Sequence, residues 1–174
     1  MNGSSISIHI KKATIHVARE SLAGGQIIDL SASELIKPTN AERFELVLDG
    51  NAVTDHSTGL MWAKDVSDDD LEWDQGSQYC RDFRLGGFDD WRYASLHERF
   101  NITDFHRHEP ALPPQFKGRG SYEWTGEPTN WTRGKAGSSR SFWVVYLYGG
   151  NLYYYGADGR ARVRPVRRAV PAGQ

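Results

Sequence analysis

The chain has 174 residues, a formal net charge of −1, 39% apolar residues, six Trp and eight Tyr. This length suits one domain with a modest appendage, and the near-zero charge excludes a global attraction to nucleic acid or to an anionic membrane. The single cysteine excludes an intrachain disulfide framework and a four-cysteine zinc site, and no run approaches the roughly 20 apolar residues that insert across a membrane.

The N-terminal quarter of the chain predicts a small, β-rich segment. Apolar and polar residues alternate along 5–20, and the alternation changes phase at Lys11 and Lys12, which predicts a turn or a bulge there. Residues 26–30 predict a further short strand, and residues 31–37 predict a short helix that ends before a proline.

Residues 1–43 are too few to bury a core of their own, so we expect them to dock on the main domain or on another subunit. We predict that they form a docking and assembly segment, through which the chain joins other proteins or a homo-oligomer such as a trimer. Residues 1–5 lack the basic and apolar regions of a secretory signal, so we expect the protein to fold in the cytoplasm.

The next part of the chain predicts three short strands, over residues 44–48, 52–54 and 60–63. Polar, glycine-containing stretches separate them at 49–51 and 55–59, which is typical of tight turns. In the third strand large side chains occupy both alternating positions. One face should therefore meet the core, and the other a second layer or solvent.

A helix is predicted over residues 71–83, where apolar side chains recur at helical spacing until glycines follow. Three acids at 68–70 suit the start of this helix, because acidic side chains interact well with its exposed amides. Calcium also prefers oxygen ligands, but consecutive acids cannot all point at one ion, so we predict no cofactor there. Cys80 falls on the apolar stripe, which predicts a buried free thiol.

The region between the first helix and the last strands is less regular. Residues 95–100 predict a second, short helix, and residues 101–140 predict a long irregular loop rich in Gly, Pro, His and Trp. A loop of this length in a small domain is commonly functional or mobile. His106 and His108 could bind a metal ion from one side of an extended chain, but surface histidines explain the pattern better, so we predict no metal site.

The C-terminal part predicts an antiparallel meander of three strands over residues 141–148, 152–155 and 160–168, joined by glycine-rich turns and followed by a flexible tail at 169–174. Strands, one or two helices and a long loop together predict an α+β fold. Trp62 and Trp91 lie in periodic segments and are predicted to be core residues, as is Trp73.

Five motifs occur in an order that is characteristic when they are taken together: Thr54-Asp55 with Thr58-Gly59-Leu60-Met61-Trp62, Gly87 with Asp90-Trp91-Arg92, Tyr122-Glu123-Trp124-Thr125, Phe142-Trp143-Val144-Val145, and Val163-Arg164-Pro165-Val166-Arg167. This series resembles the Lcl C-terminal-like family, over residues 44–168. That domain occurs at the tips of bacterial collagen-like adhesins and in phage and envelope proteins. The resemblance implies a C-type-lectin-like antiparallel sheet. Many members have a cysteine where this chain has Pro165, so the disulfide that the family suggests cannot form here.

The resemblance implies a non-enzymatic binding module, which we expect to be a virion-associated phage tail or tail-fibre-tip protein recognising a cell-surface glycan or polysaccharide. An alternative is a structural or adaptor protein of a virion or envelope assembly, bound to tail or other assembly proteins through residues 1–43. No catalytic set emerges from the sequence, and the enzymes related to this fold use paired cysteines, whereas this chain has only Cys80.

The C-terminal third carries more aromatic rings than strand alternation can bury. Alternation sends Tyr153 and Tyr155 to one face of a strand and Tyr154 to the other, so at least one ring should be exposed. Such a ring suits a sugar or a protein partner, although plain packing remains an alternative. We predict one aromatic ligand-binding face made of Trp124, Trp131, Tyr148, Asn151, Tyr153, Tyr154 and Tyr155.

Charged residues complete the candidate site. Arg160, Arg162 and Arg164 share one strand face and could bind a sulfated or carboxylated polysaccharide at the edge of the aromatic face. Equally, they could face the acidic segment at 65–74. Asp90 and Arg92 flank a predicted core tryptophan, and a structural ion pair explains them better than a sugar-binding pair.

Overall fold

The computed structural model describes residues 5–10, 13–18, 43–118 and 121–169. The chain divides into two compact units, Met1–Lys37 and Pro38–Gln174. In the first unit, β1 (Ser5–Ile10) and β2 (Ala13–Ala18) pair antiparallel, with Ile10 opposite Ala13, so the chain reverses where the phase change predicted a turn. The strand and helix predicted at 26–30 and 31–37 lie outside the described residues, and the assembly role of this segment stays a prediction.

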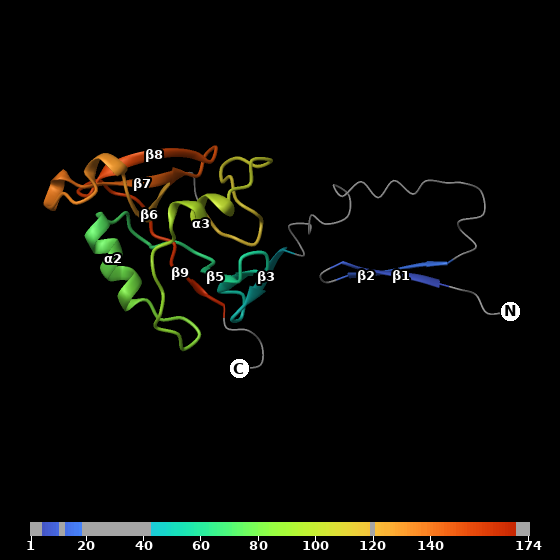
Figure 1. The fold of residues 1–174 in the computed structure, drawn as a ribbon. Helices are drawn as coiled ribbons and strands as arrows, with labels where there is room; N and C mark the ends of the chain where they lie inside the picture. The colour runs from blue at the N-terminus through green and yellow to red at the C-terminus, as the bar shows by residue number, and fades with distance from the viewer. Residues whose placement is uncertain (1–4, 11–12, 19–42, 119–120, 170–174) are drawn as a thin grey trace. The chain divides into compact units, whose positions relative to one another are not determined.

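The second unit contains a four-stranded antiparallel sheet in the order β3-β4-β5-β9 (Figure 1). Its strands are β3 (Phe44–Val47), β4 (Ala52–Asp55), β5 (Leu60–Ala63) and β9 (Val166–Arg168). The first three confirm the prediction. The predicted meander is wrong at its third strand, because the chain leaves the neighbouring sheet after residue 156 and β9 pairs with β5 instead.

A second, three-stranded sheet has the order β6-β7-β8, with β6 (Tyr122–Pro128), β7 (Ser141–Tyr146) and β8 (Asn151–Gly156). Strand β6 lies inside the stretch predicted to be irregular. Gly126 and Pro128 interrupt its alternation, and its register with β7 shifts between Trp124 and Pro128. The sequence signal for a strand is therefore weak there. The two antiparallel sheets and few helices confirm the predicted α+β class.

Two helices lie beside the sheets, α2 (Trp73–Asp82) and α3 (Leu96–Asn101). A reciprocal capping box between Glu72 and Gln75 starts α2, so the acids at 68–70 precede the helix and do not cap it as predicted. Ser95 caps α3 as the predicted short helix requires. Two single 3₁₀ turns, η2 (Asn130–Thr132) and η3 (Gly137–Ser139), connect β6 to β7.

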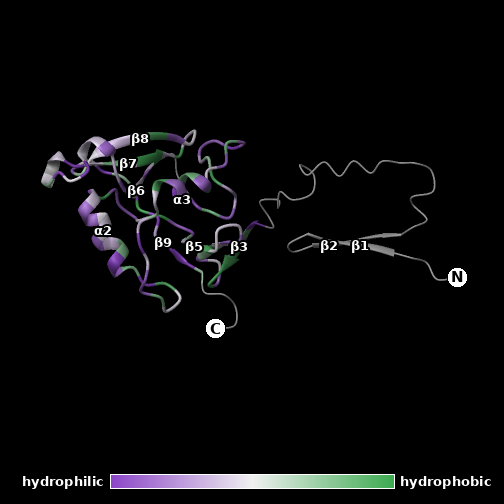
Figure 2. Cartoon of the chain, viewed as in Figure 1, coloured by the Kyte–Doolittle hydropathy of each residue, from purple (hydrophilic) through white to green (hydrophobic). Residues whose placement is uncertain are grey.

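The core surrounds strand β5, both faces of which are covered. Leu60 and Trp62 belong to a buried cluster that includes Phe116, whereas Met61 on the opposite face belongs to a cluster with Trp91. This confirms the predicted burial of both tryptophans and the second layer behind the strand. Figure 2 shows apolar residues in green along β3 and β7, whereas α2 carries both polar and apolar residues.

Cys80 is buried in α2, with 2% of its surface exposed, as the apolar stripe predicted. Burial raises the pKa of its thiol to about 12, and the thiolate is the form that reacts. We expect a thiol reagent at pH 8 to label the native protein at least about a hundredfold more slowly than the protein unfolded in guanidinium. Equal labelling rates would contradict the burial.

Candidate functional site

The rings of β7 and β8 are distributed over both faces of the three-stranded sheet. Tyr154 lies opposite Trp143, and Tyr153 lies opposite Val144. Because side chains alternate along a strand, the two neighbouring tyrosines point to opposite faces, as the sequence predicted. The single aromatic face that we predicted is therefore two separate surfaces, one on each side of the sheet.

One face carries a tyrosine cluster, defined by Tyr122, Tyr146, Tyr148, Tyr153 and Tyr155. The rings of Tyr122 and Tyr146 stack with centroids 4.4 Å apart, and the ring of Tyr148 continues the stack at 6.0 Å from Tyr146. Tyr148 and Tyr153 are about half exposed, and Tyr155 is partly covered by Tyr122. This surface is a flat, mostly self-packed ladder of rings.

The other face carries a tryptophan corner, defined by Trp131, Trp143 and Tyr154. The ring of Trp131 lies 5.1 Å from Tyr154 and 5.7 Å from Trp143, nearly perpendicular to each. Trp131 is 54% exposed and Tyr154 is 55% exposed. Perpendicular rings leave the flat face of at least one ring open to a ligand. In the tyrosine cluster, stacking covers more of the ring faces.

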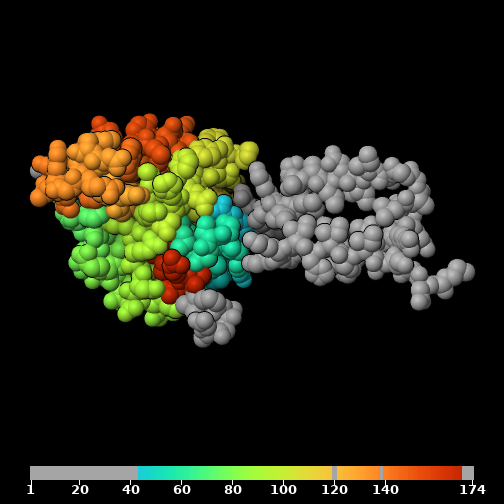
Figure 3. Space-filling model, viewed as in Figure 1, coloured from blue at the N-terminus to red at the C-terminus, as the bar shows by residue number. Residues whose placement is uncertain are grey.

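A hydrogen-bonded network fixes the segment that carries Trp131. The hydroxyl of Thr129 lies 2.8 Å from the hydroxyls of both Thr132 and Ser141, and all three side chains are buried. Trp131 lies between these threonines in η2, so its backbone is held on both sides. In the space-filling view this connection, in orange, forms part of the surface next to β8 (Figure 3). The ring is thus presented on a rigid support.

Two members of the predicted ligand set lie inside the domain. Trp124 is 1% exposed, and its indole N–H donates to the carbonyl of Leu71 at 2.7 Å. Arg164 is also buried, and its guanidinium donates to Glu123 at 2.8 Å. Neither side chain can contact a ligand on the surface. Asn151 is exposed at the start of β8.

The remaining arginines face the acidic segment, which was one of the two alternatives left open by the sequence. Arg162 lies 2.8 Å from Asp70, and Arg160 lies 3.4 Å from Glu72. The pair of Arg160 with Glu72 is largely exposed and Asp70 is half exposed, so both pairs contribute little stability. The acids already neutralise Arg160 and Arg162, which a polysaccharide would otherwise have to neutralise. The structure therefore provides no free stripe of these arginines beside the rings.

Asp90 and Arg92 do not pair with each other, contrary to the prediction. Asp90 binds Arg167 of β9 at 2.6 Å, and Arg92 binds Glu98 in the first turn of α3 at 2.8 Å. Hydrogen bonds from Arg167 lower the pKa of Asp90 below its ordinary value. The two pairs connect the 88–92 segment to separate elements and have a structural role.

A buried charged triad joins the two sheets. Glu123 of β6 accepts hydrogen bonds from Arg99 of α3 at 2.6 Å and from Arg164 at 2.8 Å. Arg164 also donates to the backbone carbonyls of Ala63, Lys64 and Lys117. Burial alone would raise the pKa of Glu123, but the two guanidinium charges outweigh it and hold the pKa below its ordinary value. The sheet that carries the rings is thereby fixed to β5.

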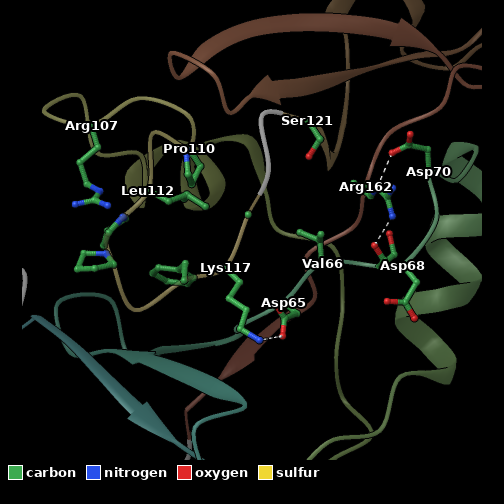
Figure 4. Close-up of a pocket in the computed structure, with 15 residues that line it drawn as sticks. Asp65, Val66, Asp68, Asp70, Arg107, Pro110, Leu112, Lys117, Ser121 and Arg162 are labelled. Carbon is green, nitrogen blue, oxygen red and sulfur yellow. Dashed lines mark hydrogen bonds and ion pairs between the residues drawn. The ribbon is translucent and has the colours of Figure 1, made fainter.

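A groove of about 760 Å³ lies at the start of β6. Figure 4 shows acids on one side, at Asp68 and Asp70, with Arg162 pointing toward them, and Arg107 on the opposite wall. Lys117 reaches Asp65 at 3.4 Å across the lower rim. The lining mixes both signs of charge with proline and leucine, and nothing in it selects one class of ligand.

A model of the Lcl C-terminal domain family matches residues 51–167. The chain belongs to this family. The match confirms the resemblance predicted from the motifs and includes the tryptophan corner and the buried triad. Comparisons with curated proteins and with solved structures give no match to the chain.

Within the described ranges of this Lcl C-terminal domain, no three His, Cys, Asp or Glu side chains gather closely enough to hold a metal ion. None of the described helices has the length and apolar character of a membrane span. Sequence reasoning left Trp143 out of the candidate site. The register of the β7–β8 hairpin could have found it, because that register sets Trp143 opposite Tyr154.

Proposed function

We propose that this Lcl C-terminal domain is a non-enzymatic, adhesin-like binding module, and that it recognises a cell-surface glycan through the tryptophan corner. The observation that carries the proposal is the pair of half-exposed, perpendicular rings of Trp131 and Tyr154, 5.1 Å apart. A pyranose ring has an apolar face that stacks on an aromatic ring, while its hydroxyls suit the polar edge of a tyrosine. The family is of the non-catalytic adhesin type, which agrees with a binding role.

Rigidity supports the same surface. An aromatic side chain loses little conformational freedom on binding, and the buried threonine network already fixes the backbone around Trp131. Trp143 covers one side of the corner, so a sugar meets a preformed angle between rings. As carrier of the module we propose a phage tail or tail fibre, in keeping with the family's occurrence in phage proteins.

The test begins with a glycan array probed with the full chain, followed by titration of the best glycan. Trp131→Ala should weaken the affinity by about 1–3 kcal/mol, which is roughly a 5- to 150-fold increase in Kd. Tyr148→Ala is the matched control, because it removes a similarly exposed ring from the opposite face. The expected result is loss with Trp131→Ala alone.

Other outcomes separate the alternatives. Equal affinity of Trp131→Ala and the unchanged protein for the glycan would disprove the corner as the binding site. A chain that binds no glycan on the array would favour the structural or adaptor role. Because Arg160 and Arg162 are already paired with acids, they should add little salt dependence to binding.

A further inference from the structure

The edges of the two sheets in the unit Pro38–Gln174 differ in how they are protected. The outer strand β3 has four residues and carries Glu45, and the outer strand β9 has three residues and carries two arginines. The outer edge of β6 is occupied, since Arg162 forms a parallel bridge with Glu123. Short length, charge and coverage are the usual devices that stop a sheet edge from pairing with another chain.

Strand β8 has none of these devices. It has six residues, Asn-Leu-Tyr-Tyr-Tyr-Gly, with no charge, no proline and no shift of register against β7. It lies at the border of its sheet (Figure 1), and no other described strand or isolated bridge pairs with its outer edge. Residues 151–154 are all exposed. Such an edge is a template for a further strand.

The hydrogen-bond pattern shows which backbone groups are open. The amide of Ala157 donates to the carbonyl of Arg140 at 2.9 Å, so these two residues form a hydrogen-bonded pair of the antiparallel ladder. Hydrogen-bonded pairs recur at every second residue along the strands. Tyr155, Tyr153 and Asn151 therefore bond to β7. The N–H and C=O groups of Leu152 and Tyr154 point to the outer edge.

We infer that β8 pairs antiparallel with β8 of a second copy of this chain, which joins two three-stranded sheets into one continuous sheet. With Leu152 opposite Tyr154 of the second copy, the open N–H and C=O groups of both residues are satisfied in both copies. The pairing requires a register that sets outward-facing residues against each other, and the register that pairs Leu152 with Tyr154 centres the twofold axis on Tyr153.

The side chains suit the same register. Tyr153 lies opposite Tyr153 of the second copy, and Leu152 opposite Tyr154, which are aromatic–aromatic and aromatic–aliphatic cross-strand pairs. No charge opposes a like charge, because 151–156 contain none. An uncharged edge offers no counter-charge to a charged partner strand, so it favours an uncharged partner. The identical strand of a second copy is itself uncharged. The pairing brings two tryptophan corners onto one platform.

Cross-linking tests the register directly. Tyr153 pairs with itself at a non-hydrogen-bonded position, where Cα atoms lie about 4.5 Å apart, within the range that a disulfide spans. Tyr153→Cys should therefore form a covalent dimer under mild oxidation, whereas Tyr154→Cys, displaced from the axis, should not. The native Cys80 is buried and does not interfere.

Sedimentation of the 174-residue chain gives the second readout. The unchanged protein should sediment as a dimer and not as the trimer considered from the sequence, and Leu152→Pro should convert it to a monomer that stays folded, because the lost N–H points away from β7. Leu152→Val is the matched control and should remain dimeric. A monomer at every concentration would overturn the inference, and so would a dimer that persists in Leu152→Pro or that fails to cross-link through Tyr153→Cys.

Discussion

Replacing Glu123 with Gln is expected to lower the free energy of unfolding by about 3–5 kcal/mol. The variant keeps the shape of the side chain but leaves Arg99 and Arg164 buried together without a counter-charge. Both guanidinium groups are essentially inaccessible to water, so solvent cannot replace the lost carboxylate. Denaturation by urea, with the slope and midpoint fitted together, measures the change.

The matched control is Asp70→Asn, which removes the same charge from an exposed pair. Asp70 lies 2.8 Å from Arg162, and half of its side chain is exposed. Its loss should cost less than about 1 kcal/mol, because water screens the pair. Equal losses in the two variants would show that the triad does not hold the sheets together.

The triad also contributes to the way acid affects stability. The pKa of Glu123 lies below its ordinary value of 4.5 in the folded protein, because its two arginines outweigh the effect of burial. The unfolded chain therefore binds the proton more readily than the folded one. The stabilisation is complete above the ordinary pKa and is lost as the pH falls through the lower, folded pKa. Glu123→Gln should lack this part of the acid dependence.

The parts of the fold that were predictable from the sequence are those determined by local patterns. Strand β5 is recognisable from its alternation, and α3 from the capping residues Ser95 and Glu98. Strand β6 is not, because Gly126 and Pro128 break its period. Strand β9 was recognisable as a strand, but its sequence does not indicate that it pairs with β5.

The candidate site was only partly predictable, for a similar reason. Alternation separates Tyr153 from Tyr154 but cannot say which face another element will cover. The triad links residues 24 and 41 positions apart, and no local pattern connects Glu123 to Arg99 or Arg164. Burial of Trp124 is equally non-local, since its N–H partner Leu71 lies 53 positions away.

Trp124→Ala is expected to destabilise the domain by about 3–5 kcal/mol, although its sequence position suggested a ligand-binding role. The ring is 1% exposed and packs in a cluster with Val144 and Val163, so truncation leaves a cavity that the strands cannot close. It also removes one of the two hydrogen bonds to the carbonyl of Leu71, which still accepts from the amide of Ala161 at 3.1 Å. Chemical denaturation followed by circular dichroism measures the loss without relying on the removed fluorophore.

Trp131→Ala is the control for the same residue type on the surface, and it should change the free energy of unfolding by less than about 0.5 kcal/mol. Trp124→Phe helps to separate the two contributions to the loss, because it retains a six-membered ring in the core while removing the N–H and the rest of the indole. Its cost should be smaller than that of Trp124→Ala, with about 0.5–1.5 kcal/mol from the lost hydrogen bond, because the carbonyl of Leu71 keeps Ala161 as a donor. If Trp124→Ala were as stable as Trp131→Ala, the ring of Trp124 would have to lie outside the core, where the sequence alone had suggested it.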